Sequence, residues 1–170
     1  MQNLYKIEIC HYQIGQNQLG KLRFDTLDVE IFGQNLRKQI PAIVQGMKSA
    51  AAGVSPFELK IGTIGAFGSR YQPRVLWFGI DKSEQLEQIY TQIQKEMWKI
   101  GFKFDFGNFV PHITIARINK IDDKHRFWNL IESMKVPLIQ QVKVEKIILY
   151  ESILDERVPE YKVIEEVIFL

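Results

Sequence analysis

Three polar side chains in the segment PHITIAR, residues 111–117, have the chemistry needed to bind and cleave a phosphate ester. His112 carries an imidazole, the side chain best suited to exchange a proton near neutral pH. Thr114 offers a hydroxyl that can donate a hydrogen bond to an anionic oxygen. Arg117 offers a planar, positively charged fork that matches phosphate. Together the three residues predict a site that holds a phosphate ester and moves a proton without a metal.

The spacing of these residues sets a condition on the strand that carries them. Residues two apart in a strand point to the same face, so His112 and Thr114 share one face. In a regular strand Arg117 points to the other face. It reaches the histidine only if the strand ends, bulges or twists near Ala116, or if its long side chain wraps around the edge. Spacing alone leaves open a structural alternative, in which His112 is an ordinary core or edge residue.

Residue periodicity predicts the elements that must position this segment. Strands are indicated by alternating apolar residues or by β-branched and aromatic clusters, and helices by apolar stripes at helical spacing. The predicted strands are 4–12, 26–33, 57–64, 74–80, 112–118, 142–150 and 161–169, and the predicted helices are 35–53, 83–100 and 122–135.

Capping residues and apolar stripes give the predicted helices more detail. Gly53 and Gly101 are expected to end the first two helices, and Asp81 with Glu84 forms a capping-box pattern before the second. Pro41 is expected to kink the first helix or to mark its start. The expected buried stripes are Leu36, Ile40, Ile43, Val44 and Met47 in the first helix, Leu86, Ile89, Tyr90, Ile93, Met97 and Ile100 in the second, and Phe127, Leu130, Ile131 and Met134 in the third.

The order strand, helix, strand, strand occurs twice, with an offset of about 85 residues. It predicts an α+β fold with two pseudo-symmetric lobes of antiparallel strands and flanking helices around a central cleft. We expect a single domain, 1–170, with lobe one at about 1–80, lobe two at about 81–170 and strands exchanged between the lobes. Equivalent positions of the two copies would line the cleft, where a ligand would bind.

Composition limits the classes of protein that this chain can represent. The 170 residues are 46% hydrophobic and 25% charged, which is typical of a soluble globular domain. A net charge of +2 is too small to indicate nucleic-acid binding by itself. The single cysteine, Cys10, excludes an internal disulfide and a cysteine-based zinc site. Without a signal peptide or a long apolar run, we expect a cytoplasmic monomer with no cofactor.

The segment PHITIAR resembles the second signature of the two-histidine phosphoesterases, and most closely their 2'-5' RNA ligase-like, RNA 2',3'-cyclic phosphodiesterase branch. The segments PFELKIGTIGAF, PRVLWFGI, ILYES and YKVIEEVIFL resemble other strands of that branch, so that the likeness covers roughly residues 33–170. The resemblance implies that the substrate is an RNA end or a cyclic-phosphate nucleotide. It implies that His112 moves a proton, that Thr114 holds a phosphoryl oxygen, and that Arg117 offsets its charge. It also implies reversible 2'-5' joining of RNA ends and no metal.

The first His-x-Thr motif of that family is degenerate in this chain. If Gly33 matches the family's glycine, Thr26 and Asp28 stand where histidine and threonine are expected. Losing one general acid or base typically costs on the order of 10²–10⁴ in rate. Three alternatives stay open: His11 or Asp28 substitutes for the missing group, the protein is a catalytically impaired phosphate or RNA-end binding module, or the segment before residue 33 is an altered start.

Four further residues are candidates for a place beside the cleft. Arg70, Tyr71 and Arg74 are candidates to contact phosphate or base, and Tyr150 is a candidate to stack on a base. His125 is assigned no role. Trp77 and Phe78 are expected in the core.

Overall fold

The computed structural model describes residues 4–11, 28–32, 36–102, 109–134, 138–153 and 160–170. Within these ranges seven antiparallel strands form one sheet in the order β2-β1-β6-β3-β4-β5, and β7 pairs with β6. The strands are β1 (Leu4–His11), β2 (Asp28–Phe32), β3 (Phe57–Ser69), β4 (Gln72–Ile80), β5 (His112–Arg117), β6 (Gln140–Ile153) and β7 (Glu160–Ile168). The helices are α1 (Leu36–Ala51), α2 (Glu84–Lys99) and α3 (Lys124–Ser133). The predicted α+β class is confirmed.

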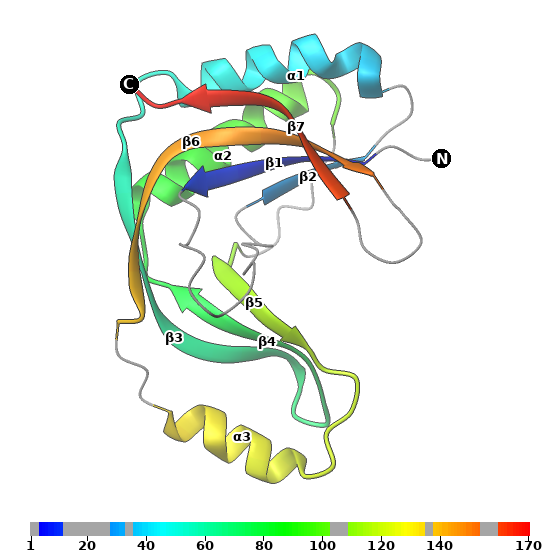
Figure 1. Cartoon of the computed structure of the whole chain (residues 1–170), viewed down its shortest axis with the longest axis vertical. Coiled ribbons are helices and arrows are strands. Elements are labelled where there is room, and N and C mark those ends of the chain that lie inside the picture. Colours follow the sequence, from blue (N-terminus) through cyan, green and yellow to red (C-terminus); the bar gives the residue numbers. More distant parts are fainter. Residues whose placement is uncertain (1–3, 12–27, 33–35, 103–108, 135–137, 154–159) are drawn as a thin grey trace.

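Two long strands, β3 and β6, connect the two ends of the sheet. Residues 57–61 of β3 pair with residues 140–144 of β6, and beyond this stretch β3 pairs with β4 while β6 pairs with β1 and β7. The sheet bends along these strands into an open arc, with β2 and β5 on its inner side (Figure 1). Helices α1 and α2 cover one end of the arc, and α3 lies outside the other end.

The two halves of the chain share this sheet. Strand β4, from the first half, pairs with β5 from the second, and β6 and β7 lie with β1 at the other end. Helix α2 packs against α1 rather than beside β5. Each end of the sheet is therefore built from both halves of the sequence.

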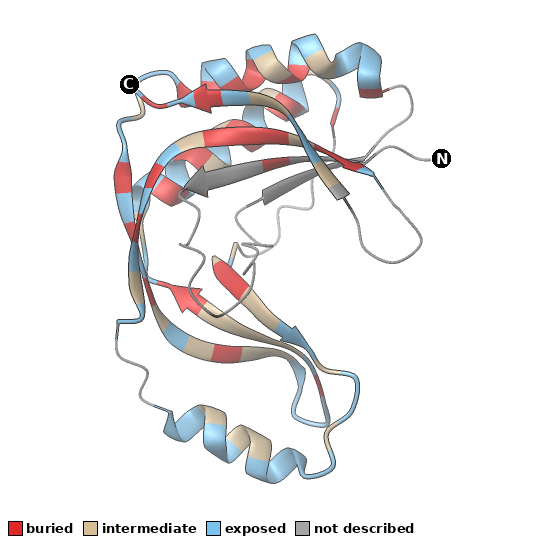
Figure 2. Ribbon diagram, viewed as in Figure 1, coloured by how far each residue is buried: buried red, intermediate tan, exposed pale blue. Residues whose placement is uncertain are grey.

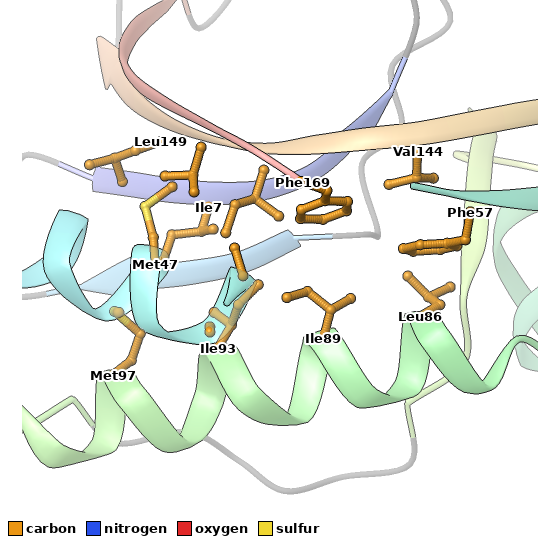
Figure 3. Packing of buried hydrophobic residues seen from close by; sticks show 14 of the residues in the cluster. Ile7, Met47, Phe57, Leu86, Ile89, Ile93, Met97, Val144, Leu149 and Phe169 are labelled. Carbon is orange, nitrogen blue, oxygen red and sulfur yellow. The ribbon is translucent and has the colours of Figure 1, made fainter. Parts of the chain in front are cut away.

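The main core lies between the sheet and helices α1 and α2. The apolar stripe of α2 is confirmed, because Leu86, Ile89, Ile93 and Met97 are fully buried. These side chains face Met47 of α1 and residues of the strands (Figure 3). The strand residues in this layer include Ile7, Phe57, Val144 and Leu149, and Phe169, which directly follows β7, packs with them. Burial of each such side chain contributes about 1.5–3 kcal/mol to stability.

The helix ends follow the sequence signals in part. Gly53 and Gly101 have positive φ angles of 75° and 95° and end α1 and α2, as predicted. The prediction that Asp81 caps α2 is wrong, since the N-cap is Ser83, whose side chain accepts from the N–H of Leu86. The N–H of Asp81, directly after β4, instead donates to the carbonyl oxygen of Lys60 in β3 at 2.8 Å. Pro41 lies inside α1, which begins at Leu36.

The inward face predicted for α3 is wrong for two of its four residues. Leu130 is 50% exposed and Met134 is 52% exposed, while Phe127 and Ile131 are half-buried. Figure 2 shows α3 in the colours of exposed and intermediate residues. Polar contacts attach this helix to the tip of the β3–β4 hairpin. Arg70 forms an ion pair with Glu132 at 2.7 Å, and Nε1 of Trp128 donates to the carbonyl oxygen of Arg70. A helix anchored at a hairpin tip has too little sheet beneath it to cover a whole apolar stripe.

Candidate active site

Strand β5 carries the candidate residues, and a bulge decides which face each of them occupies. His112 pairs with Gly79, and Thr114 pairs with Trp77. The next residue of β4, Leu76, pairs with Ala116 rather than with Ile115, so β5 has one more residue than β4 at this point. Ile115 is the additional residue, and Arg117 consequently pairs with Val75. A bulge of this kind re-aims the side chains beyond it.

The bulge brings the three candidate residues to one face of the sheet. Val75, Trp77 and Gly79 alternate along β4 and therefore share a face. Directly paired residues of neighbouring strands lie on the same face, so Arg117, Thr114 and His112 share a face as well. The strand thus bulges next to Ala116, which is one of the conditions that the spacing had set for Arg117.

The imidazole of His112 is held by its neighbours. The residue is 8% exposed, and its Nδ1 lies 2.8 Å from the carbonyl oxygen of Val110. A carbonyl oxygen only accepts, so Nδ1 carries the hydrogen of this bond. The ring meets Phe67 edge-on at 4.6 Å between centroids, and Trp77 lies 5.9 Å away. The two aromatic rings hold the imidazole in its orientation, and the carbonyl oxygen of Val110 selects the tautomer with hydrogen on Nδ1.

Trp77 has a larger part in this arrangement than the sequence indicated. It was expected in the core, but it is half-buried and packs between Phe67, at 5.1 Å, and His112. Its cross-strand partner is Gly65, and a Cβ at Gly65 would overlap the indole ring. The indole therefore lies over a residue without a side chain. Gly65 directly follows the predicted strand 57–64 and lies inside β3, where a glycine marks the close approach of another group.

Thr114 and Arg117 are available to a ligand. Thr114 is half-buried and Arg117 is exposed. Within the described ranges, neither side chain takes part in a hydrogen bond or an ion pair. A hydroxyl and an unpaired guanidinium on the same face as a buried imidazole form an arrangement that can bind an anionic oxygen and exchange a proton with its ester.

The remnants of the first motif lie largely outside the described residues. Thr26 belongs to 12–27, which are not among them, and the side chains of His11 and Asp28 are outside as well. The backbone of Asp28 opens β2. Strands β2 and β5 end the strand order, and both lie on the inner side of the arc (Figure 1).

The remaining candidates lie elsewhere or have other contacts. Arg70 is paired with Glu132, and Tyr71 is 84% exposed at the hairpin tip. The guanidinium of Arg74 donates to the side-chain oxygen of Gln72 at 3.4 Å. Tyr150 meets the ring of Tyr161 edge-on at 6.2 Å. The described contacts of Arg70, Arg74 and Tyr150 are thus with residues other than His112.

Metal ligands and membrane-spanning helices are both absent from the described residues. These residues contain no group of three or more histidine, cysteine, aspartate or glutamate side chains that could hold a metal ion. No helix in the described part of the chain has the length and apolar character needed to cross a membrane.

Sequence comparison identifies the family. A family model described as the 2'-5' RNA ligase superfamily matches residues 26–156. The RNA 2',3'-cyclic phosphodiesterase of Thermotoga maritima is 32% identical over 141 residues, which cover 82% of this chain and 73% of that protein. The protein of the same name from Methanocaldococcus jannaschii is 33% identical over 113 residues, 66% of this chain and 64% of that protein. The chain belongs to the 2'-5' RNA ligase superfamily, and the resemblance to the two-histidine phosphoesterases is confirmed.

Solved structures show the same fold. TT0787 of Thermus thermophilus has a TM-score of 0.69 and 17% identity, and the match covers 99% of this chain and 98% of that chain. Escherichia coli LigT complexed with 3'-AMP has a TM-score of 0.63 and 16% identity, over 83% of this chain and 74% of that chain. The arrangement of strands and helices is therefore that of LigT-like phosphoesterases.

Proposed function

We propose that this chain is a phosphoesterase that acts on RNA ends and opens a terminal 2',3'-cyclic phosphate to a monoester. The observation that carries the proposal is the bulge at Ile115, which puts His112, Thr114 and Arg117 on one face of β5 and its partner strand. The family relation supports the same activity, because the relatives compared above are named RNA 2',3'-cyclic phosphodiesterases. Reversible 2'-5' joining of RNA ends belongs to the same proposal: the 5'-hydroxyl of a second RNA replaces water, its oxygen bonds to phosphorus, the bond from phosphorus to O3' breaks, and a proton passes on balance from the 5'-oxygen to O3'.

Each of the three residues has a role that follows from its geometry. Arg117 is exposed and positively charged, and it attracts the phosphate and offsets its charge. The Thr114 hydroxyl donates to a phosphoryl oxygen. Nδ1 of His112 is engaged with Val110, so proton exchange falls to Nε2. The aromatic rings against His112 hold Nε2 in one direction.

The reaction forms one bond to phosphorus and breaks another. A water oxygen bonds to phosphorus, and the bond from phosphorus to one ribose oxygen breaks. The water loses a proton, and the released ribose oxygen gains one. Two proton transfers are therefore needed, one from water and one to the leaving oxygen. His112 carries out one of them. The names of the relatives favour this enzyme over the binding module, which would share the phosphate contacts but lack turnover.

The test is direct turnover of a defined RNA. The protein is incubated with an oligonucleotide that ends in a 2',3'-cyclic phosphate, and the monoester product is identified by the mass of one added water. His112→Ala should lower the rate by about 10²–10⁴. His125→Ala is the matched control, because His125 is exposed on α3 and its ring contacts Asn129 of the same helix. Equal loss in both variants, or turnover that survives His112→Ala, would contradict the proposal.

A further inference from the structure

A second bulge, in β3, turns another polar residue toward His112. Ile61 pairs with Ile80, and Thr63 pairs with the neighbouring residue of β4, Gly79. Strand β3 therefore has one more residue than β4 at this point. Gly62 is the additional residue. Ile61 and Thr63 would share a face in a regular strand, but here Ile61 lies in the core and Thr63 lies on the opposite face.

Thr63, Gly79 and His112 form one row across three strands. Gly79 pairs with Thr63 on one side and with His112 on the other. Side chains that face each other directly across neighbouring strands have Cβ atoms about 4.5–5.5 Å apart. Thr63 and His112 therefore lie on the same face, about two strand spacings of 4.7–4.9 Å apart, and the residue between them has no side chain.

The Thr63 hydroxyl occupies the space that a side chain at Gly79 would fill. A Cβ built on Gly79 would overlap Oγ1 of Thr63 and would lie 3.1 Å from Cζ3 of Trp77. The hydroxyl thus leans over Gly79, toward the strand that carries His112. Gly79 itself is buried, and glycine inside a strand is unfavourable unless a neighbouring group must approach closely.

The hydroxyl is also open to a ligand. Thr63 is an exposed residue, and no hydrogen bond engages its side chain in the part of the chain that the structure describes. The other positions of this face beside it are Trp77, Gly65 and Phe67, which offer aromatic rings or no side chain. Thr63 is thus the polar group that the bulge in β3 presents on the face of His112, across Gly79.

We propose that Thr63 is a further substrate-binding residue, whose hydroxyl hydrogen-bonds an oxygen of the phosphate ester held beside His112. This inference rests on the proposed function of the same site. Thr114 and Arg117 contact the ester from β5, and Thr63 contacts it from β3, across Gly79. The ester is then bound by residues of two strands, and the substrate-binding site includes a residue of β3 in addition to the motif on β5.

The experiment compares Thr63→Val, which removes the hydroxyl at nearly constant shape, with Thr63→Ser, which keeps it. Loss of a hydrogen bond to a charged group should lower kcat/KM for a 2',3'-cyclic phosphate by about 10- to 100-fold in Thr63→Val. Thr63→Ser should stay close to the wild type. Thr91→Val is the matched control, since Thr91 is exposed on α2 and bonds its own helix backbone. Equal kcat/KM for Thr63→Val and Thr91→Val would overturn the inference.

Wild type and His112→Ala are assayed alongside, so that the two proposals can fail separately. Turnover that is lost in His112→Ala but unchanged in Thr63→Val keeps the proposed function and rejects the role of Thr63. If the wild type shows no turnover, the proposed activity fails. The role of Thr63 is then tested by calorimetry, which compares the binding of a nucleoside 3'-monophosphate to the wild type and to Thr63→Val. Binding about tenfold or more weaker in Thr63→Val supports the inference. Equal binding, or no binding by the wild type, rejects it.

Discussion

Gly65→Ala should disturb His112 although residue 65 does not touch it. An added Cβ would lie 2.8 Å from Cε2 of Trp77 and nearer still to two other atoms of the ring. Such distances are not tolerated, so the indole must move. The indole lies 5.1 Å from the ring of Phe67 and 5.9 Å from that of His112, so a shifted indole changes its packing against these two rings. Movement of Trp77 is therefore passed to the imidazole.

The size of the effect follows from the packing. Overfilling a packed site typically costs about 1–3 kcal/mol. For a chain of this length, each kcal/mol lowers Tm by about 2–4 °C, which gives a fall of about 2–12 °C in all. Displacement of a catalytic group by about 1 Å can cost on the order of 10²-fold in rate. We therefore expect a moderate loss of stability and a larger loss of kcat/KM.

A double-mutant cycle separates this mechanism from general damage. Urea unfolding and kcat/KM are measured for Gly65→Ala, Trp77→Leu and the double variant. Because Trp77→Leu removes the ring, Gly65→Ala should cost much less in its presence, with a coupling of about 0.5–3 kcal/mol in the free energy of unfolding.

Gly46→Ala is the control for the cycle. Gly46 is also buried, but its added Cβ meets mainly the flexible end of Met97, far from β5. This variant should keep kcat/KM whatever its stability. Additive costs in the cycle, or equal kcat/KM for Gly65→Ala and Gly46→Ala, would refute the idea that Trp77 positions His112.

Three other expectations concern the rest of the chain. Thr26→His combined with Asp28→Thr restores the family's first motif and should raise the single-turnover rate by up to about 10²–10⁴; an unchanged rate would mean that the chain already has a second proton-transfer group. Arg117→Ala should raise KM and weaken its dependence on salt, because an exposed guanidinium attracts the phosphate through screened charge; kinetics at several ionic strengths would test this. Met134→Gln should change the free energy of unfolding by less than about 0.5 kcal/mol, whereas Ile93→Ala should lower it by about 2–5 kcal/mol, and urea titration would distinguish these values.

Local periodicity was sufficient for much of the fold. The buried stripe of α2 repeats at the spacing of a helix, and its burial needs only one apolar surface opposite, which the sheet and α1 provide. The same reasoning failed for α3, since an apolar stripe does not tell whether enough partner surface exists to cover it. Leu130 and Met134 have the pattern of core residues but face solvent. Burial depends on the tertiary partner, which a local pattern does not contain.

The candidate site also has a part that the sequence predicts and a part that it does not, and the difference is due to the two bulges. His112 and Thr114 are two apart, so alternation alone places them on one face. Arg117 and Thr63 reach that face only because Ile115 and Gly62 are additional residues in their strands.

A bulge is a property of two paired strands, so no count along one strand could locate it. Glycine was the available signal. Gly79 interrupts the predicted strand 74–80 and Gly65 directly follows the predicted strand 57–64. Each lies on this face under the side chain of a neighbour, Thr63 over Gly79 and Trp77 over Gly65. In this sheet each of the two glycines lies under a side chain of the neighbouring strand, and both side chains, Trp77 and Thr63, lie on the face of His112.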